Sequence, residues 1–121
     1  MDMDAQFPLF VIEKDYSSMT LIEAPERILY HLEAIDIENG EYLFWDSTRA
    51  GINISVERGR VKQITLCDQA MSLQEAFETY AKSRGLQVIA GESALETWRG
   101  LQSQLPPRKS LWERLFHKPK S

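Results

Sequence analysis

The sequence contains few of the side chains that carry most enzyme chemistry. Among 121 residues there is one cysteine, Cys67, and there are two histidines, His31 and His117. A single cysteine excludes an internal disulfide and is typical of a reducing compartment. These three residues also lack the paired spacing and the number of ligands that a zinc site needs. We therefore expect neither a metal nor a cofactor.

Several longer motifs are missing as well. No apolar run approaches the roughly 18 residues that would span a bilayer, and residues 1–6 carry two aspartates and no basic residue. A secretory signal would begin with positive charge and a transit peptide would be rich in arginine, so we predict a cytoplasmic protein. The glycines do not have the spacing of a phosphate-binding loop, and there is no Gly-x-Ser-x-Gly or Cys-x-x-Cys motif.

Cys67 allows two interpretations. It could act as a nucleophile with His31 or His117 as its base. Alternatively, it is a small apolar residue at the end of a strand, with no basic neighbour in the sequence to lower its pKa. We favour the second interpretation and predict that the protein is not an enzyme, although a catalytic site with dispersed residues stays an alternative.

The composition is that of a folded domain, but the charge is divided unevenly. Hydrophobic residues make up 43% and charged residues 26% of the chain, which has a net charge of −4. Residues 106–121 contain five basic residues and one acid, a net charge of +4, which leaves −8 for residues 1–105. We predict one domain over residues 1–105 and a basic amphipathic tail over residues 106–121. The acidic domain should repel nucleic acid and attract a basic partner.

The hydrophobic pattern predicts an α+β fold, with about five antiparallel strands in the order ββαβββ followed by two or three helices. The expected strands cover residues 7–13, 19–22, 41–45, 52–56 and 60–67, and Arg58-Gly59 forms a tight turn between the last two. A further short edge strand could cover residues 86–90.

Helix signals occur in four places. Pro25 suits a first turn, and Ile28, Leu29, Leu32 and Ile35 follow at helical spacing, so we expect them to face the core. Three serines are each followed by glutamate three positions later, which predicts capping boxes that open helices. These pairs are Ser72 with Glu75, Ser93 with Glu96, and Ser110 with Glu113.

Carboxylates gather between the first helix and the third strand, next to aromatic residues. Such a group could hold a hard cation, but the alternating oxygen ligands and central glycine of a calcium loop are missing. It could also be an ordinary solvated face. A third interpretation is an acidic patch that binds a partner, since charge complementarity governs encounter and specificity. The candidate residues are Glu33, Asp36, Glu38, Glu41, Tyr42 and Asp46, and Trp45 would be a second aromatic anchor if it is exposed.

The tail also allows two interpretations. On a helix, four apolar residues would share one face between basic neighbours: Leu111, Trp112, Leu115 and Phe116. Such a helix could lie in an anionic membrane surface or dock in the groove of a partner. It could equally fold back on the acidic domain, because so short a helix needs packing to be stable.

The stretch from His31 to Asp46 joins a helix, a Glu-Asn-Gly turn and an aromatic strand that ends in aspartate. In this respect residues 7–68 resemble small bacterial toxin-immunity proteins. The resemblance implies a non-enzymatic inhibitor that binds a cognate toxin, often a basic nuclease, through a complementary surface. It identifies no individual binding residues and does not account for the tail.

The sequence therefore predicts a protein-binding module, in the form of an immunity protein that inhibits a toxin. The alternative is a peripheral membrane or scaffold adaptor that is attached through residues 106–121. Deletion of the tail would separate the two, because an adaptor would lose its localisation and an inhibitor would keep its affinity.

Overall fold

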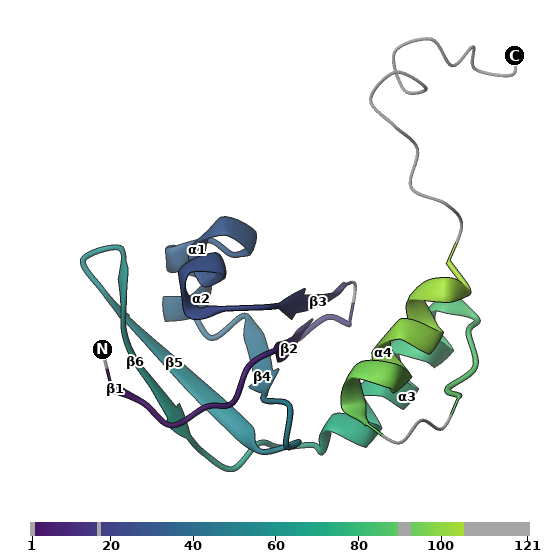
Figure 1. Cartoon of the computed structure of the whole chain (residues 1–121). Coiled ribbons are helices and arrows are strands. Elements are labelled where there is room, and N and C mark those ends of the chain that lie inside the picture. The colour runs from purple at the N-terminus through teal and green to yellow at the C-terminus, as the bar shows by residue number, and fades with distance from the viewer. Residues whose placement is uncertain (1, 17, 90–92, 106–121) are drawn as a thin grey trace, which may run out of the picture.

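A mostly antiparallel sheet forms the centre of the molecule. The computed structural model describes residues 2–16, 18–89 and 93–105. Its strands are β1 (Asp2–Met3), β2 (Leu9–Glu13), β3 (Met19–Ile22), β4 (Tyr42–Trp45), β5 (Gly51–Glu57) and β6 (Arg60–Leu66). They lie in the order β1-β6-β5-β4-β2-β3 (Figure 1). Strands β2 to β6 pair antiparallel, which confirms the predicted five-stranded sheet, and the two-residue β1 pairs parallel with β6.

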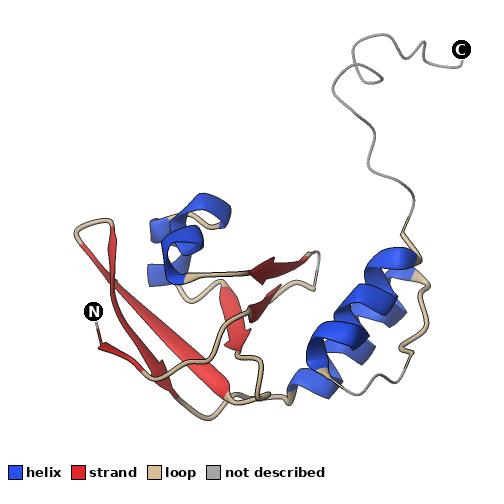
Figure 2. Ribbon diagram, in the orientation of Figure 1, coloured by secondary structure: helices blue, strands red, loops and turns tan. Residues whose placement is uncertain are grey.

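Helices lie on both sides of this sheet. A 3₁₀ turn (Pro25–Arg27) leads into α1 (Ile28–His31) and α2 (Ala34–Glu38), and the longer α3 (Leu73–Arg84) and α4 (Ala94–Ser103) follow β6. Figure 2 shows these helices as two separate groups, with β2, β3 and β4 between them. The predicted α+β class is confirmed.

Strand β2 lies between β4 and the edge strand β3, and its side chains are buried on both faces. Leu9 and Val11 point to one face, Phe10 and Ile12 to the other, and none of the four is more than 2% exposed. A strand that is apolar at every position is expected where helices cover both sides of a sheet. β2 therefore separates two hydrophobic cores.

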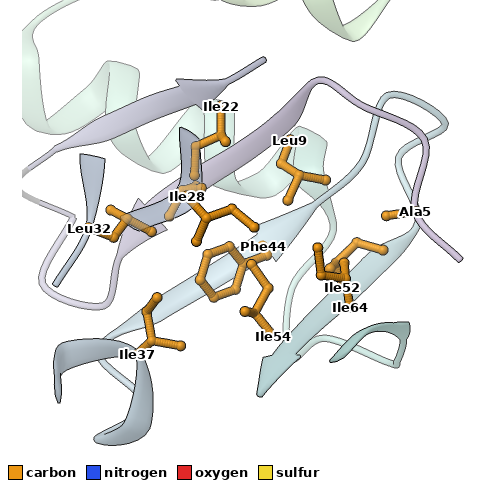
Figure 3. Close-up of a cluster of buried hydrophobic side chains, with 11 residues drawn as sticks. Ala5, Leu9, Ile22, Ile28, Leu32, Ile37, Phe44, Ile52, Ile54 and Ile64 are labelled. Carbon is orange, nitrogen blue, oxygen red and sulfur yellow. The ribbon is translucent and has the colours of Figure 1, made fainter. Parts of the chain in front are cut away.

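The first core lies between the sheet and the short helices α1 and α2 (Figure 3). Ile28, Leu32 and Ile37 come from the helical side. The sheet contributes alternate residues of five strands and one residue that precedes β2, because successive side chains of a strand point to opposite faces. These residues are Ala5, Leu9, Val11, Ile22, Phe44, Ile52, Ile54 and Ile64.

The second core lies under α3 and α4. The ring of Phe77 packs edge-on against Phe10 with 5.7 Å between their centroids. Trp45 is 1% exposed, and its indole Nε1 donates a hydrogen bond to the carbonyl of Met71 at 3.2 Å. Trp45 is therefore a core residue and is not an exposed aromatic anchor.

The serine half of the predicted capping box is present at both α3 and α4. The Ser72 hydroxyl accepts a hydrogen bond from the Glu75 amide at 3.1 Å, and the Ser93 hydroxyl accepts one from the Glu96 amide at 3.2 Å. Gly85 ends α3 with a φ of 69°, in the left-handed conformation that glycine adopts most easily. The third predicted cap, at Ser110, lies outside the described residues.

The helix expected after Pro25 is interrupted, and this corrects the predicted inward face. Leu32 and Glu33 have extended backbone, with ψ values of 145° and 137°, so α1 and α2 are separate short helices. Because of this break, the spacing of apolar residues in α1 does not continue into α2, and different positions face the core. Ile37 is buried, whereas Leu29 and Ile35, both expected in the core, are 38% and 60% exposed.

The possible edge strand at residues 86–90 is also corrected. Residues 86–89 have no strand conformation, and residue 90 lies outside the described part of the chain. The Gln104 side chain satisfies the backbone here, because its oxygen accepts from the Gln87 amide at 2.9 Å and its nitrogen donates to the Gln87 carbonyl at 2.7 Å.

Candidate functional site

Cys67 and His31, the two described residues of the possible nucleophile–base pair, lie apart. Cys67 follows β6 and lines hollows formed with Gly51 and Asp68, whereas His31 ends α1 and lines a different hollow beside β3. Burial, and then the charge of Asp68, raise the pKa of the Cys67 thiol above its usual value. A raised pKa reduces the fraction of reactive thiolate. The geometry therefore does not pair this thiol with His31, and His117 lies outside the described residues.

The prediction that Asp46 belongs to an exposed acidic patch is wrong. Its side chain is 1% exposed. One carboxylate oxygen accepts a hydrogen bond from the Gln6 amide at 3.0 Å. The other accepts from the Thr48 amide at 2.9 Å, the Thr48 hydroxyl at 2.6 Å and the Ala50 amide at 3.2 Å. Asp46 thus organises the turn between β4 and β5.

Tyr42, Asp36 and Glu33 do lie close to one another. Burial raises the pKa of the Tyr42 hydroxyl, and the charges of Asp36, Glu13 and Glu33 raise it further. The hydroxyl also hydrogen-bonds to the Asp36 side chain. Three carboxylates, from the end of β2, the start of α2 and the first turn of α2, therefore act electrostatically on one half-buried phenol. This local negative field was expected from the sequence except for Glu13.

Glu38 and Glu41 are exposed at the end of α2 and in the turn that follows. The main chain holds this turn, because the Glu41 amide donates to the Asp36 carbonyl at 3.0 Å and the Lys14 amide donates to the Glu41 carbonyl at 2.9 Å. Gly40 has a φ of 69°, and a Cβ there would lie 3.5 Å from the Lys14 ammonium nitrogen. The two glutamates thus project from a fixed turn with one lysine nearby.

The same part of the chain exposes large apolar side chains that were not predicted to be exposed. Tyr30 is 73%, Ile35 60% and Leu29 38% exposed. The guanidinium of Arg27 lies over the Tyr30 ring, 5.0 Å from its centroid. Only two other large apolar side chains among the described residues are comparably exposed: Leu66 on β6 and Ile89 in the loop after α3.

We call residues 26–41 the acidic–apolar segment. It contains five carboxylates and one arginine in addition to the three exposed apolar side chains. One signal in the sequence could have revealed it. Two short helices cannot bury six large apolar residues on one face, so some of them had to face solvent. These residues are Ile28, Leu29, Tyr30, Leu32, Ile35 and Ile37.

The predicted docking residues of the tail, Leu111, Trp112, Leu115 and Phe116, lie outside the described residues. Within residues 2–16, 18–89 and 93–105, no three histidine, cysteine, aspartate or glutamate side chains are grouped so that they could hold a metal ion. No helix in the described part of the chain is both long enough and apolar enough to cross a membrane.

Comparisons with known proteins add no family. Protein-family models, curated proteins and solved structures were all searched, and none matched this chain. The resemblance to toxin-immunity proteins therefore stays a prediction.

Proposed function

We propose that the protein is a non-enzymatic binding module that holds a basic partner protein through the acidic–apolar segment. The observation that carries this proposal is the exposure of Tyr30 and Ile35 beside Glu33, Asp36 and Glu38. Most soluble monomers expose large apolar residues singly, whereas a group of them with a polar rim marks an interaction surface.

The two kinds of side chain would have different roles. Tyrosine is among the residues that most often dominate binding energy when a partner buries them, so Tyr30 would be the main anchor. The carboxylates would accelerate encounter with a positively charged partner and orient it. The net charge of −8 over residues 1–105 acts in the same direction.

A toxin inhibitor of the immunity type is the form of this function that we favour. Such an inhibitor needs a rigid complementary surface and no chemistry of its own, and α1 and α2 are fixed to the sheet by Ile28, Leu32 and Ile37. A cytoplasmic location fits the single cysteine. A basic toxin would meet the acidic surface with complementary charge.

Charge reversal tests this proposal. The double variant Glu38→Lys and Glu41→Lys should associate with the partner about tenfold more slowly and with weaker salt dependence, because two attractive charges become repulsive. The partner would be the protein that co-purifies with the wild-type chain, and stopped-flow mixing would give the association rates.

A matched control has the same change in net charge elsewhere. Asp68 and Glu78 are exposed outside the acidic–apolar segment, so Asp68→Lys with Glu78→Lys should slow association much less. Equal slowing by both pairs would show that only the total charge matters and would contradict a local binding surface. Deletion of residues 107–121 should leave the affinity unchanged, and a loss of affinity would favour attachment through the tail.

A further inference from the structure

Strand β3 has one side that no described strand pairs with. It is the last strand of the sheet, and β2 is its only strand neighbour among the described residues. Glu13 and Ser18 form a hydrogen-bonded pair, in which the Glu13 amide donates to the Ser18 carbonyl at 3.2 Å. Two residues further along each strand, Val11 lies opposite Thr20. Because bonded pairs alternate along an antiparallel ladder, the backbone groups of Thr20 and Ile22 face β2. Those of Met19 and Leu21 face away from it, and no described backbone group bonds to them on that side.

The opposite edge of the sheet differs from this one. There, β1 covers β6 at Gln63 and Ile64, and the exposed Arg60 and Lys62 place charged groups on β6, with Lys62 paired to Glu57 at 2.8 Å. Covering an edge or placing charges on it are common ways to prevent unwanted strand pairing. The residues of β3, Met-Thr-Leu-Ile, include no charge and no proline. This edge is therefore chemically open to a further strand.

The open edge forms the floor of a trough of about 420 Å³. Met19, Thr20 and Leu21 line it from β3, and Glu23 and His31 line it on the side of α1. Trp98 and Gln102 of α4 line it from the other helical layer. The indole Nε1 of Trp98 is buried and has no hydrogen-bond partner in the described part of the chain. Leaving such a buried donor unpaired costs free energy.

We infer that this trough binds one extended segment of a partner protein, which pairs with β3 as an additional strand. Main-chain hydrogen bonds to Met19 and Leu21 would supply affinity, as in other cases of strand addition. The carboxylate of Glu23 and the net negative charge of the domain favour a segment that carries lysine or arginine. A second copy of this chain would bring the same net negative charge and its own Glu23 to this edge, which disfavours pairing between copies.

This inference goes beyond the proposed function, since it concerns a different surface and a different mode of binding. The trough could fail to bind an extended segment while the acidic–apolar segment still binds its partner. Equally, the trough could bind a segment while the acidic–apolar segment binds nothing. Two capped hexapeptides would serve as probes of the trough in the full-length chain. One alternates valine with lysine and the other alternates valine with glutamate.

The test follows the backbone amides by NMR. The lysine peptide should shift the Met19 and Leu21 amide signals and the Trp98 indole signal, and it should slow hydrogen exchange at both amides. The glutamate peptide should bind at least about tenfold more weakly. No shift at these positions, or equal binding of both peptides, would overturn the inference.

A variant and its control separate backbone pairing from side-chain contact. Leu21→Pro removes an amide that faces the open side, and an edge strand tolerates proline there. It should weaken binding about tenfold relative to Leu21→Ala, which keeps the amide. If Leu21→Pro does not fold, the shifts in the unaltered chain decide the question alone.

The free chain provides a second measurement. Without peptide, the Met19 and Leu21 amides should exchange rapidly, whereas the Thr20 and Ile22 amides should be protected. Slow exchange at Met19 and Leu21 would contradict the inference, because the edge would already be occupied. Protection that increases with protein concentration would identify a second copy, and protection independent of concentration would identify another part of the same chain.

Discussion

Asp46 shows how one residue can be mistaken for a surface group. In the sequence it ends an acidic stretch, yet in the structure its carboxylate accepts four hydrogen bonds from Gln6, Thr48 and Ala50. Gln6 lies 40 positions earlier in the chain. No local pattern could have indicated this contact, because it depends on how β2 and β4 pair.

The ionisation of Asp46 should contribute to stability. Burial alone would raise the pKa of its carboxyl, but the hydrogen bonds from Thr48, Gln6 and Ala50 outweigh burial and lower the pKa below its usual value. A lowered pKa in the folded state stabilises the fold above the unfolded pKa of about 3.9. That contribution is lost as the pH falls through the lower, folded pKa.

Asp46→Asn should therefore lower the free energy of unfolding by about 2 kcal/mol at pH 7. An amide group would replace one accepting oxygen with a donor that cannot serve its N–H partners. Urea denaturation at several pH values would measure the effect, with the exposed Asp68→Asn as control. The difference from the wild type should shrink below about pH 4, where the carboxyl of the unfolded chain begins to take up a proton, and it should continue to shrink as the pH falls through the lower, folded pKa. A difference that stays constant down to pH 2 would contradict this account.

At the scale of elements, the local signals in the sequence were the reliable ones. The strands, the Arg58-Gly59 turn and the caps of α3 and α4 all depend on residues close in sequence. Arg58 and Gly59 have φ values of 53° and 73°, as a tight hairpin turn requires. The break at Leu32 and Glu33 was missed because neither glycine nor proline marks it.

Ser72 provides a test of the contribution of a cap. Ser72→Ala should lower the free energy of unfolding by about 1 kcal/mol, since the Glu75 amide loses its acceptor at the start of α3. Thermal or urea unfolding would measure it. Ser83→Ala is the matched control in the same helix, because the Ser83 hydroxyl only donates to the Tyr80 carbonyl at 2.7 Å. Equal effects of the two substitutions would contradict a specific role for the cap.

At the scale of the whole molecule, two features that suit binding lie on different elements. The acidic–apolar segment spans α1 and α2, and the open edge belongs to β3 beside α4. The sequence predicted the carboxylates of the first feature but placed Leu29 and Ile35 in the core. It predicted β3 as a strand but could not show that β3 ends the sheet, because strand order depends on long-range pairing.

Site-specific photo-crosslinking in the native cell would show whether the acidic–apolar segment contacts a basic partner. A photoreactive phenylalanine would replace Tyr30 in one variant and Leu66, 58% exposed on β6, in a control. Mass spectrometry would identify any protein joined to either position. We predict that the Tyr30 variant captures one basic protein and that the Leu66 variant does not. Absence of any adduct at Tyr30, or the same set of proteins at both positions, would contradict this contact.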